Sequence, residues 1–79
     1  MNLTIISPRE KKTYTIAWIE VETAIGNFVI QQDHVPTILL VKPHEPITFC
    51  LTNGKQETFI SAGGILEIQR ESARLLLNE

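Results

Sequence analysis

The stretch ITFCLTNGKQETFI, residues 47–60, decides the fold class of this chain. Apolar and polar residues alternate on both sides of Asn53-Gly54, and Asn-Gly between two alternating runs is the strongest short-range signal for a β-hairpin. A two-residue type I′ turn there predicts three inward-facing pairs, namely Ile47/Ile60, Phe49/Thr58 and Leu51/Gln56. Phe59 is then expected on the outer face, beside Cys50, where a partner could cover it.

The rest of the chain also has the composition of short strands. It contains 11 Ile, 4 Val and 8 Thr against 4 Ala, and β-branched side chains pack well on a pleated surface. Proline and glycine divide the chain into segments, and we expect further strands at residues 2–7, 14–23, 28–30, 37–42, 65–69 and 72–77. These features predict an all-β domain, a small β-sandwich or flattened barrel of about 8–10 short, mostly antiparallel strands.

Three segments carry expectations of their own. One side of residues 14–23 changes from apolar to acidic near Trp18, which predicts a bulge where the strand passes from one sheet to another. Residues 37–42 are almost wholly apolar and indicate a buried strand. Residues 70–77 contain good helix formers, but the segment is short and uncapped at its end, so we predict a strand at 72–77.

Length and charge exclude several classes of protein. The 79 residues suffice for one domain, residues 1–79. The net charge of −2 and the lack of a basic block argue against binding to nucleic acid. A single cysteine excludes an intramolecular disulfide. No run approaches the length of a membrane span, and the start of the chain does not resemble a secretory signal. We expect a small, soluble, intracellular domain.

The residues that usually carry chemistry are isolated from one another. His34 and His44 have no further metal ligand at a suitable spacing, and Cys50 has no basic neighbour that would activate its thiol. Glu20 and Glu22 are expected on a solvated strand face rather than in a concave site. Gly63-Gly64 lacks the features of a phosphate-binding loop. We therefore expect no enzyme activity, no metal, no cofactor and no small-molecule ligand.

Four segments in sequence order resemble the epsilon subunit of F-type ATP synthases. They are LTIISP (residues 3–8), GNFVIQQDHVP (26–36), TILLVKP (37–43) and SAGGILEI (61–68). The resemblance extends over essentially the whole chain and implies the N-terminal β-sandwich domain of that subunit. The chain ends at Glu79, where the family's C-terminal helical hairpin would begin, and the start at Met1 favours a naturally short epsilon subunit over a truncated one.

The resemblance also implies a function. In the family this domain belongs to the central stalk of a proton-translocating F-type ATP synthase, couples the gamma subunit to the c-ring and catalyses no reaction. It would be peripheral, at the cytoplasmic face of the energy-coupling membrane, and not inserted in the membrane. By this resemblance Gly26, Asn27 and Phe28 would face the c-ring, with Phe28 at an exposed loop tip; the alternative is that Phe28 folds inward into the core. His34, Val35 and Pro36 would face gamma or support that interface.

The chain departs from the family at the predicted interface. Asn27 replaces an acidic residue, Val29 replaces a glycine, and Gln32-Asp33 replaces Pro-Gly before the histidine. Asp33 tolerates a positive φ better than most residues, so the turn can persist. Two alternatives stay open at this point, a β-barrel module that binds a ligand and a small adaptor of another intracellular complex, because a fold does not determine a function.

Overall fold

The computed structural model describes residues 1–79, and every regular element in it is a strand. The eight strands are β1 (Asn2–Ile6), β2 (Lys11–Thr23), β3 (Gly26–Gln31), β4 (Thr37–Val41), β5 (Pro46–Leu51), β6 (Gln56–Ile60), β7 (Gly64–Ile68) and β8 (Ser72–Leu77). The all-β prediction is therefore confirmed, with predicted and observed strand ends differing by three residues at most. The structure contains no helix that is long and apolar enough to span a membrane.

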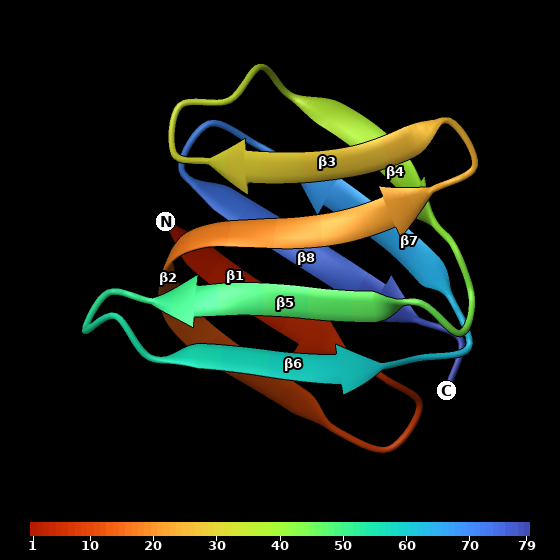
Figure 1. Cartoon of the computed structure of the whole chain (residues 1–79). Helices are drawn as coiled ribbons and strands as arrows, with labels where there is room; N and C mark the ends of the chain where they lie inside the picture. Colours follow the sequence, from red (N-terminus) through yellow and green to blue (C-terminus); the bar gives the residue numbers. More distant parts are fainter.

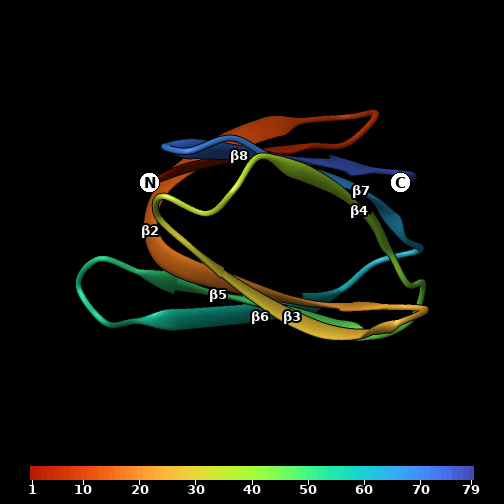
Figure 2. The same ribbon diagram turned by 90° about the horizontal axis from the view of Figure 1, so that it is seen from above.

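The strands form two layers that face each other (Figures 1 and 2). The back sheet contains β4, β7, β8, β1 and residues 11–15 of β2, in that order, and the front sheet contains β3, β5, β6 and the remainder of β2. All neighbouring strands are antiparallel except β1 and β8, which are parallel. The result is a curled sandwich joined through one shared strand.

The shared strand β2 bends at the predicted place. Its pairing with β5 shifts register between Ile16 and Trp18. Ile16 and Ile19 are both buried, although they are three positions apart, an odd spacing that normally puts two side chains of a strand on opposite faces. The bulge therefore changes which residues face inward, so that β2 contributes buried side chains to the inner faces of both sheets (Figure 2).

The core lies between the sheets and draws on both. Its 13 buried residues are Met1, Leu3, Ile16, Ile19, Val21, Ile30, Val41, Ile47, Phe49, Leu66, Ile68, Ala73 and Leu75. Burying each large aliphatic side chain contributes about 1.5–3 kcal/mol relative to exposure. Because these residues come from seven of the strands and from Met1, the two layers are held together along their length.

The β5–β6 hairpin exists, but its predicted register is wrong by one residue. Ile47 lies opposite Phe59, and Phe49 lies opposite Glu57. The Leu51 N–H donates to the Lys55 carbonyl, and the Gly54 N–H donates to the Leu51 carbonyl. Of the turn residues only Gly54 has a positive φ, +93°, which corresponds to a type I turn followed by a glycine bulge rather than a type I′ turn. Phe59 consequently points inward and contacts the core, so its predicted outward position is also wrong.

Of the two other segments with a specific expectation, residues 72–77 agree with it and residues 37–42 agree only in part. Residues 72–77 form a strand, as predicted, because β8 pairs on both sides and buries Ala73 and Leu75. The expectation that residues 37–42 form a buried strand is wrong for half of its side chains. β4 is the last strand of the back sheet, and its outward Ile38 and Leu40 are 66 % and 70 % exposed.

Candidate protein-interaction surfaces

The first predicted group, Gly26, Asn27 and Phe28, begins β3 instead of forming a loop tip. The turn before it consists of Ala24 and Ile25, between paired Thr23 and Gly26. The Thr23 hydroxyl accepts the Ile25 N–H at 3.2 Å and donates to the Gly26 carbonyl at 2.9 Å. The residue exposed at the tip is Ile25, at 85 %.

Phe28 therefore does not occupy the exposed loop tip that the family resemblance implied. It is half-buried, lies opposite buried Val21 and packs against the core. Asn27 is exposed, and its side-chain amide donates to the Glu22 carboxylate at 2.7 Å. Of the first group, Gly26 and Asn27 are at the surface, while the Phe28 side chain packs against the core on the inner side of β3.

The second predicted group, His34, Val35 and Pro36, lies in the connection from β3 to β4. Asp33 has a φ of +67°, as its tolerance for this conformation predicted, and its N–H donates to the Arg70 carbonyl at 2.8 Å. The half-buried His34 ring places Nδ1 2.8 Å from the Val35 carbonyl oxygen. Val35 is 72 % exposed. The loop is thus tied to the fold by backbone contacts and presents an apolar side chain outward.

The two groups are at opposite ends of β3 (Figure 1). Six residues of extended chain separate them, which corresponds to about 20 Å. The structure therefore does not bring them into one site. It offers them as two separate surfaces, one at each end of the sandwich.

A third surface was missed by the reading of the sequence. The apolar row, as we call it, consists of Leu40, Ile65, Leu76 and Ile6 on the outer face of the back sheet, with Ile38 beside it. The pairings Leu40/Ile65, Ile65/Leu76 and Leu76/Ile6 place these residues side by side across β4, β7, β8 and β1. Exposed apolar side chains grouped in this way indicate an interaction surface.

The outer face of the front sheet is more polar. Glu20 lies between Val29 on one side and Thr48 on the other, and the Thr48 and Thr58 hydroxyls are 3.0 Å apart. Next to the apolar row, in contrast, the charged groups are Lys11, which lies opposite Ile6 at the end of the row, and Glu67 and Arg74, which pair at 2.9 Å. The front face therefore mixes polar side chains with separate exposed apolar ones, Val29 and Ile60, whereas on the back face apolar side chains are neighbours across four strands.

Periodicity could not have found the apolar row. The run TILLV, residues 37–41, has its one polar residue, Thr37, on the inner side with Leu39 and Val41, so no polar residue marks the outward side. The available signal was architectural, because a strand of an antiparallel sandwich buries one face only. Consecutive apolar residues in such a strand imply that every second one is outside.

The remaining polar residues form no reactive arrangement. No three His, Cys, Asp or Glu side chains are grouped so that they could hold a metal ion. The Cys50 thiol is buried and donates to the Leu51 carbonyl at 3.4 Å. His44 is exposed in a turn with a φ of +63°.

A comparison with protein families identifies the chain. The family described as "ATP synthase, Delta/Epsilon chain, beta-sandwich domain" matches residues 1–79. The chain belongs to this family. No curated protein matches it.

Solved structures share the fold of this delta/epsilon-chain domain. A chain of the Euglena gracilis mitochondrial ATP synthase, from a structure of OSCP, F1 and the c-ring, matches with a TM-score of 0.89 and 20 % identity over 98 % of this chain. A chain of the Tetrahymena thermophila mitochondrial ATP synthase, from a structure of the central stalk and c-ring, matches with a TM-score of 0.84 and 16 % identity over 100 %. The delta/epsilon-chain domain spans 49 % and 63 % of the length of those two chains.

Proposed function

We propose that this domain is a non-catalytic part of the central stalk of a proton-translocating F-type ATP synthase, where it joins the gamma subunit to the c-ring. The complex would place it at the cytoplasmic face of the energy-coupling membrane. The observation that carries the proposal is the apolar row, an exposed apolar surface in a chain that belongs to the delta/epsilon family over its whole length.

The apolar row is proposed as the gamma-binding surface. It continues into the second predicted group, because alternation places Pro36, Ile38 and Leu40 on the same side of the sheet. Val35, exposed next to Pro36, extends the same surface. An apolar centre with a polar border is typical of stable protein interfaces, and here Glu67 and Arg74 provide part of that border.

The turn at the start of β3 is proposed as the contact with the c-ring. Ile25 presents an apolar side chain at its tip, and Asn27 and Glu22 form a polar pair beside it. The Thr23 hydroxyl bonds fix the turn, so its tip is held in one conformation. A rigid tip contributes to binding because less conformational entropy is lost on association.

The architecture suits a mechanical role. A stalk element that links two rotating parts must deform little, and close-packed protein interiors have low compressibility. The strand β2 belongs to both sheets, so a force applied to one layer is passed to the other through a covalent chain. The proposal requires no bond-making chemistry from this chain.

Reconstitution tests the proposal. Membranes that contain the synthase of the same organism without this subunit should regain proton-driven ATP synthesis when the chain is added, and the chain should co-purify with gamma and the c-ring. The chain carrying Ile25→Asp should still bind gamma but couple poorly to the ring. A chain that associates with neither gamma nor the ring would contradict the proposal and favour an adaptor of another complex.

A further inference from the structure

The strand β6 is the free edge of the front sheet. It pairs with β5 and with no other strand. The bond from the Leu51 N–H to the Lys55 carbonyl makes Leu51 and Lys55 a hydrogen-bonded pair, and bonded and non-bonded pairs alternate along an antiparallel ladder. The backbone groups of Gln56, Thr58 and Ile60 therefore point away from β5. No hydrogen bond outside the strand ladders uses them.

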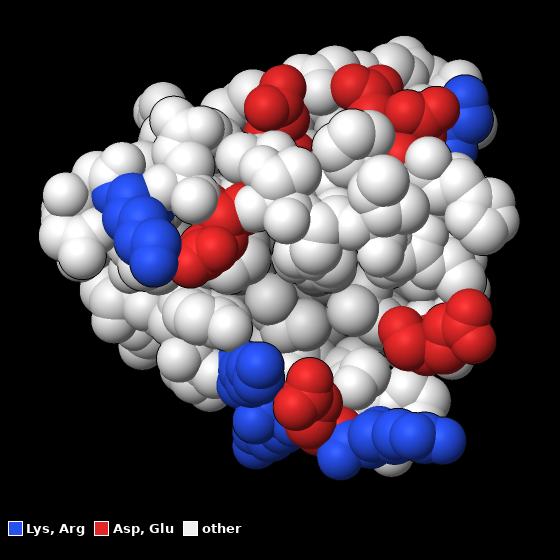
Figure 3. Space-filling view, turned by 60° about the horizontal axis from the view of Figure 1, so that its bottom comes forward, with Lys and Arg blue, Asp and Glu red and all other residues white.

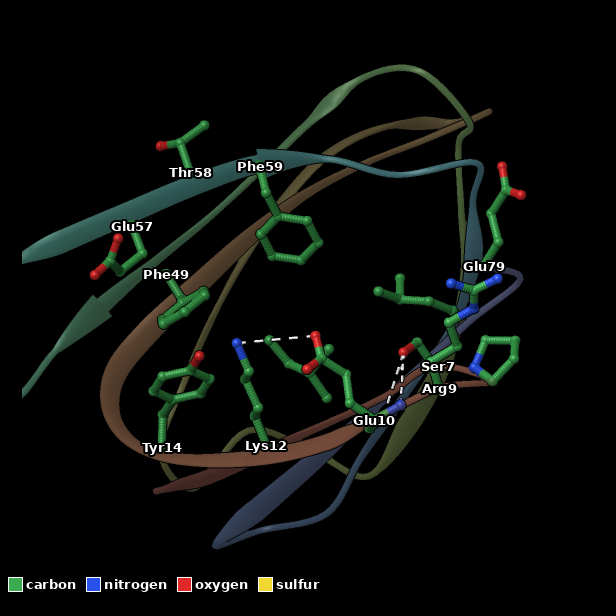
Figure 4. Close-up of a pocket in the computed structure, with 13 residues that line it drawn as sticks. Ser7, Arg9, Glu10, Lys12, Tyr14, Phe49, Glu57, Thr58, Phe59 and Glu79 are labelled. Carbon is green, nitrogen blue, oxygen red and sulfur yellow. Dashed lines mark hydrogen bonds and ion pairs between the residues drawn. The ribbon is translucent and has the colours of Figure 1, made fainter.

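A groove runs along this edge. It encloses about 580 Å³ between β6 and the β1–β2 hairpin and is lined by the apolar side chains of Ile5, Tyr14, Phe49, Phe59 and Leu77. Figure 4 shows the rings of Tyr14, Phe49 and Phe59 directed into it, with centroids 4.8 Å apart for Tyr14 and Phe49 and 6.4 Å apart for Phe49 and Phe59. In Figure 3 charged side chains surround the uncharged centre of this side of the molecule.

The edge and the groove are oriented so that one extended segment can use both. A strand added to β6 would bond to the outward backbone groups of Gln56, Thr58 and Ile60. The residues opposite Glu57 and Phe59 would then be non-bonded pairs, whose side chains approach closest, and they would enter the groove. This is the geometry of recognition by strand addition, in which the backbone gives affinity and alternate side chains give specificity.

Of the charged residues that line the groove, Glu57 is the one on β6 itself and so would lie beside an added strand, whereas Arg9, Glu10, Lys12 and Glu79 come from other parts of the chain. The Glu57 side chain lies on the groove side of β6 and is 44 % exposed, with Lys55 Nζ at 3.5 Å as its only ion pair. Such an exposed pair is weak and is readily exchanged. We propose that the β6 edge binds an extended segment of another protein, with a Lys or Arg opposite Glu57 and an apolar residue two positions away opposite Phe59. The inference goes beyond the stalk function and does not depend on it.

A second copy of this chain fits the edge poorly. Antiparallel pairing of two β6 strands places Glu57 opposite Glu57, Phe59 or Lys55. Only the last arrangement gives the carboxylate a cation, and it pairs the two strands over residues 55–57 alone and leaves Phe59 opposite the turn residue Asn53 of the copy. Charged side chains on the inner side of an edge strand are a known means of preventing self-association. The same charge therefore disfavours a copy and favours a basic partner.

The test uses the labelled full chain and two synthetic peptides. Both contain the extended pattern Val-Thr-X-Thr-Val, with X as Lys in one and Glu in the other, so that either strand direction places X opposite Glu57 and Val opposite Phe59. At millimolar peptide the Lys peptide should bind at least about fivefold more tightly than the Glu peptide. The Lys peptide places an opposite charge across from Glu57, whereas the Glu peptide places a like charge there. Amide exchange should slow at Gln56, Thr58 and Ile60.

Substitutions in the chain distinguish a specific contact at Glu57 from attraction of the peptide to the overall charge of the domain. Glu57→Lys should reverse the preference and Glu57→Gln should abolish it, while the matched control Glu20→Lys, on the outer face of the front sheet, should leave it unchanged. Thermal unfolding of each variant verifies that it is folded. The inference is overturned by absence of slowed exchange at these amides, by equal binding of the two peptides, or by sedimentation showing that the chain occupies its own β6 edge as a dimer.

Discussion

At the level of single residues, the β2–β3 hairpin divides its two large apolar side chains between the core and the surface. Phe28 packs inward against the core, and Ile25 stands at the tip, 85 % exposed. The resemblance to the family placed Phe28 at an exposed loop tip, because it assigned the loop to Gly26 onward, and the observed arrangement is the alternative in which Phe28 folds inward. The spacing of Phe28 and buried Ile30, two residues apart on one strand face, was the physical signal for the observed arrangement.

Replacement of Phe28 by alanine tests this division. Phe28→Ala should lower the free energy of unfolding by about 2–3 kcal/mol, somewhat less than the loss for a fully buried phenylalanine. In a domain of this size that corresponds to a decrease in Tm of about 10–20 °C, measurable by circular dichroism. Ile25→Ala is the matched control and should leave Tm unchanged. Equal stability of the two variants would contradict the assignment of Phe28 to the core.

At the level of elements, the pairing of β7 with β8 depends on Gly64. A Cβ atom at this position would overlap the backbone carbonyl oxygen of Leu76 and lie 3.1 Å from the Leu77 Cα. A backbone group in a ladder cannot move aside as a flexible side chain can. The absence of a side chain at Gly64 is therefore a requirement of the close approach of β7 and β8.

Alanine substitution at Gly64 and at Gly54 distinguishes the cost of overlap between an added Cβ and a neighbouring strand from the cost of a strained backbone conformation. Gly64→Ala should destabilise the domain by about 3 kcal/mol, because the β7–β8 ladder must shift. Gly54→Ala should cost about 1–2 kcal/mol, since its φ is +93° but no atom lies within 4 Å of an added Cβ. Chemical denaturation of both variants checks the difference. A Gly64→Ala variant as stable as the parent would show that the two strands are farther apart than described.

The sequence predicted the elements better than it predicted their faces. Alternation and turn residues located all eight strands, and the bulge in β2 was visible as a change from apolar to acidic residues. The register of β5 and β6 was not predictable, because Asn53-Gly54 permits a two-residue turn and also the bulged turn that is observed. One residue of slip exchanges the inner and outer faces of a strand, which is why Phe59 was placed on the wrong side.

At the level of the whole molecule, the two outer faces of the sandwich differ in a way that no single segment reveals. The apolar row gathers residues from β1, β4, β7 and β8, so it exists only once the back sheet is assembled. The predicted residues Val35 and Pro36 lie at its margin, and Gly26 and Asn27 lie at the other end of β3. The candidate surfaces were therefore partly predicted, and the largest of them required the topology.

The central claim is that the apolar row binds the gamma subunit, and its most direct test is the affinity for gamma of two matched variants, measured by titration calorimetry. Leu40→Glu, in the row, should weaken binding at least about tenfold, because it buries an unpaired charge in the interface. Val29→Glu makes the same kind of change at a 49 % exposed residue of the opposite outer face and should leave the affinity unchanged. Wild-type affinity for Leu40→Glu, or a loss confined to Val29→Glu, would contradict the claim.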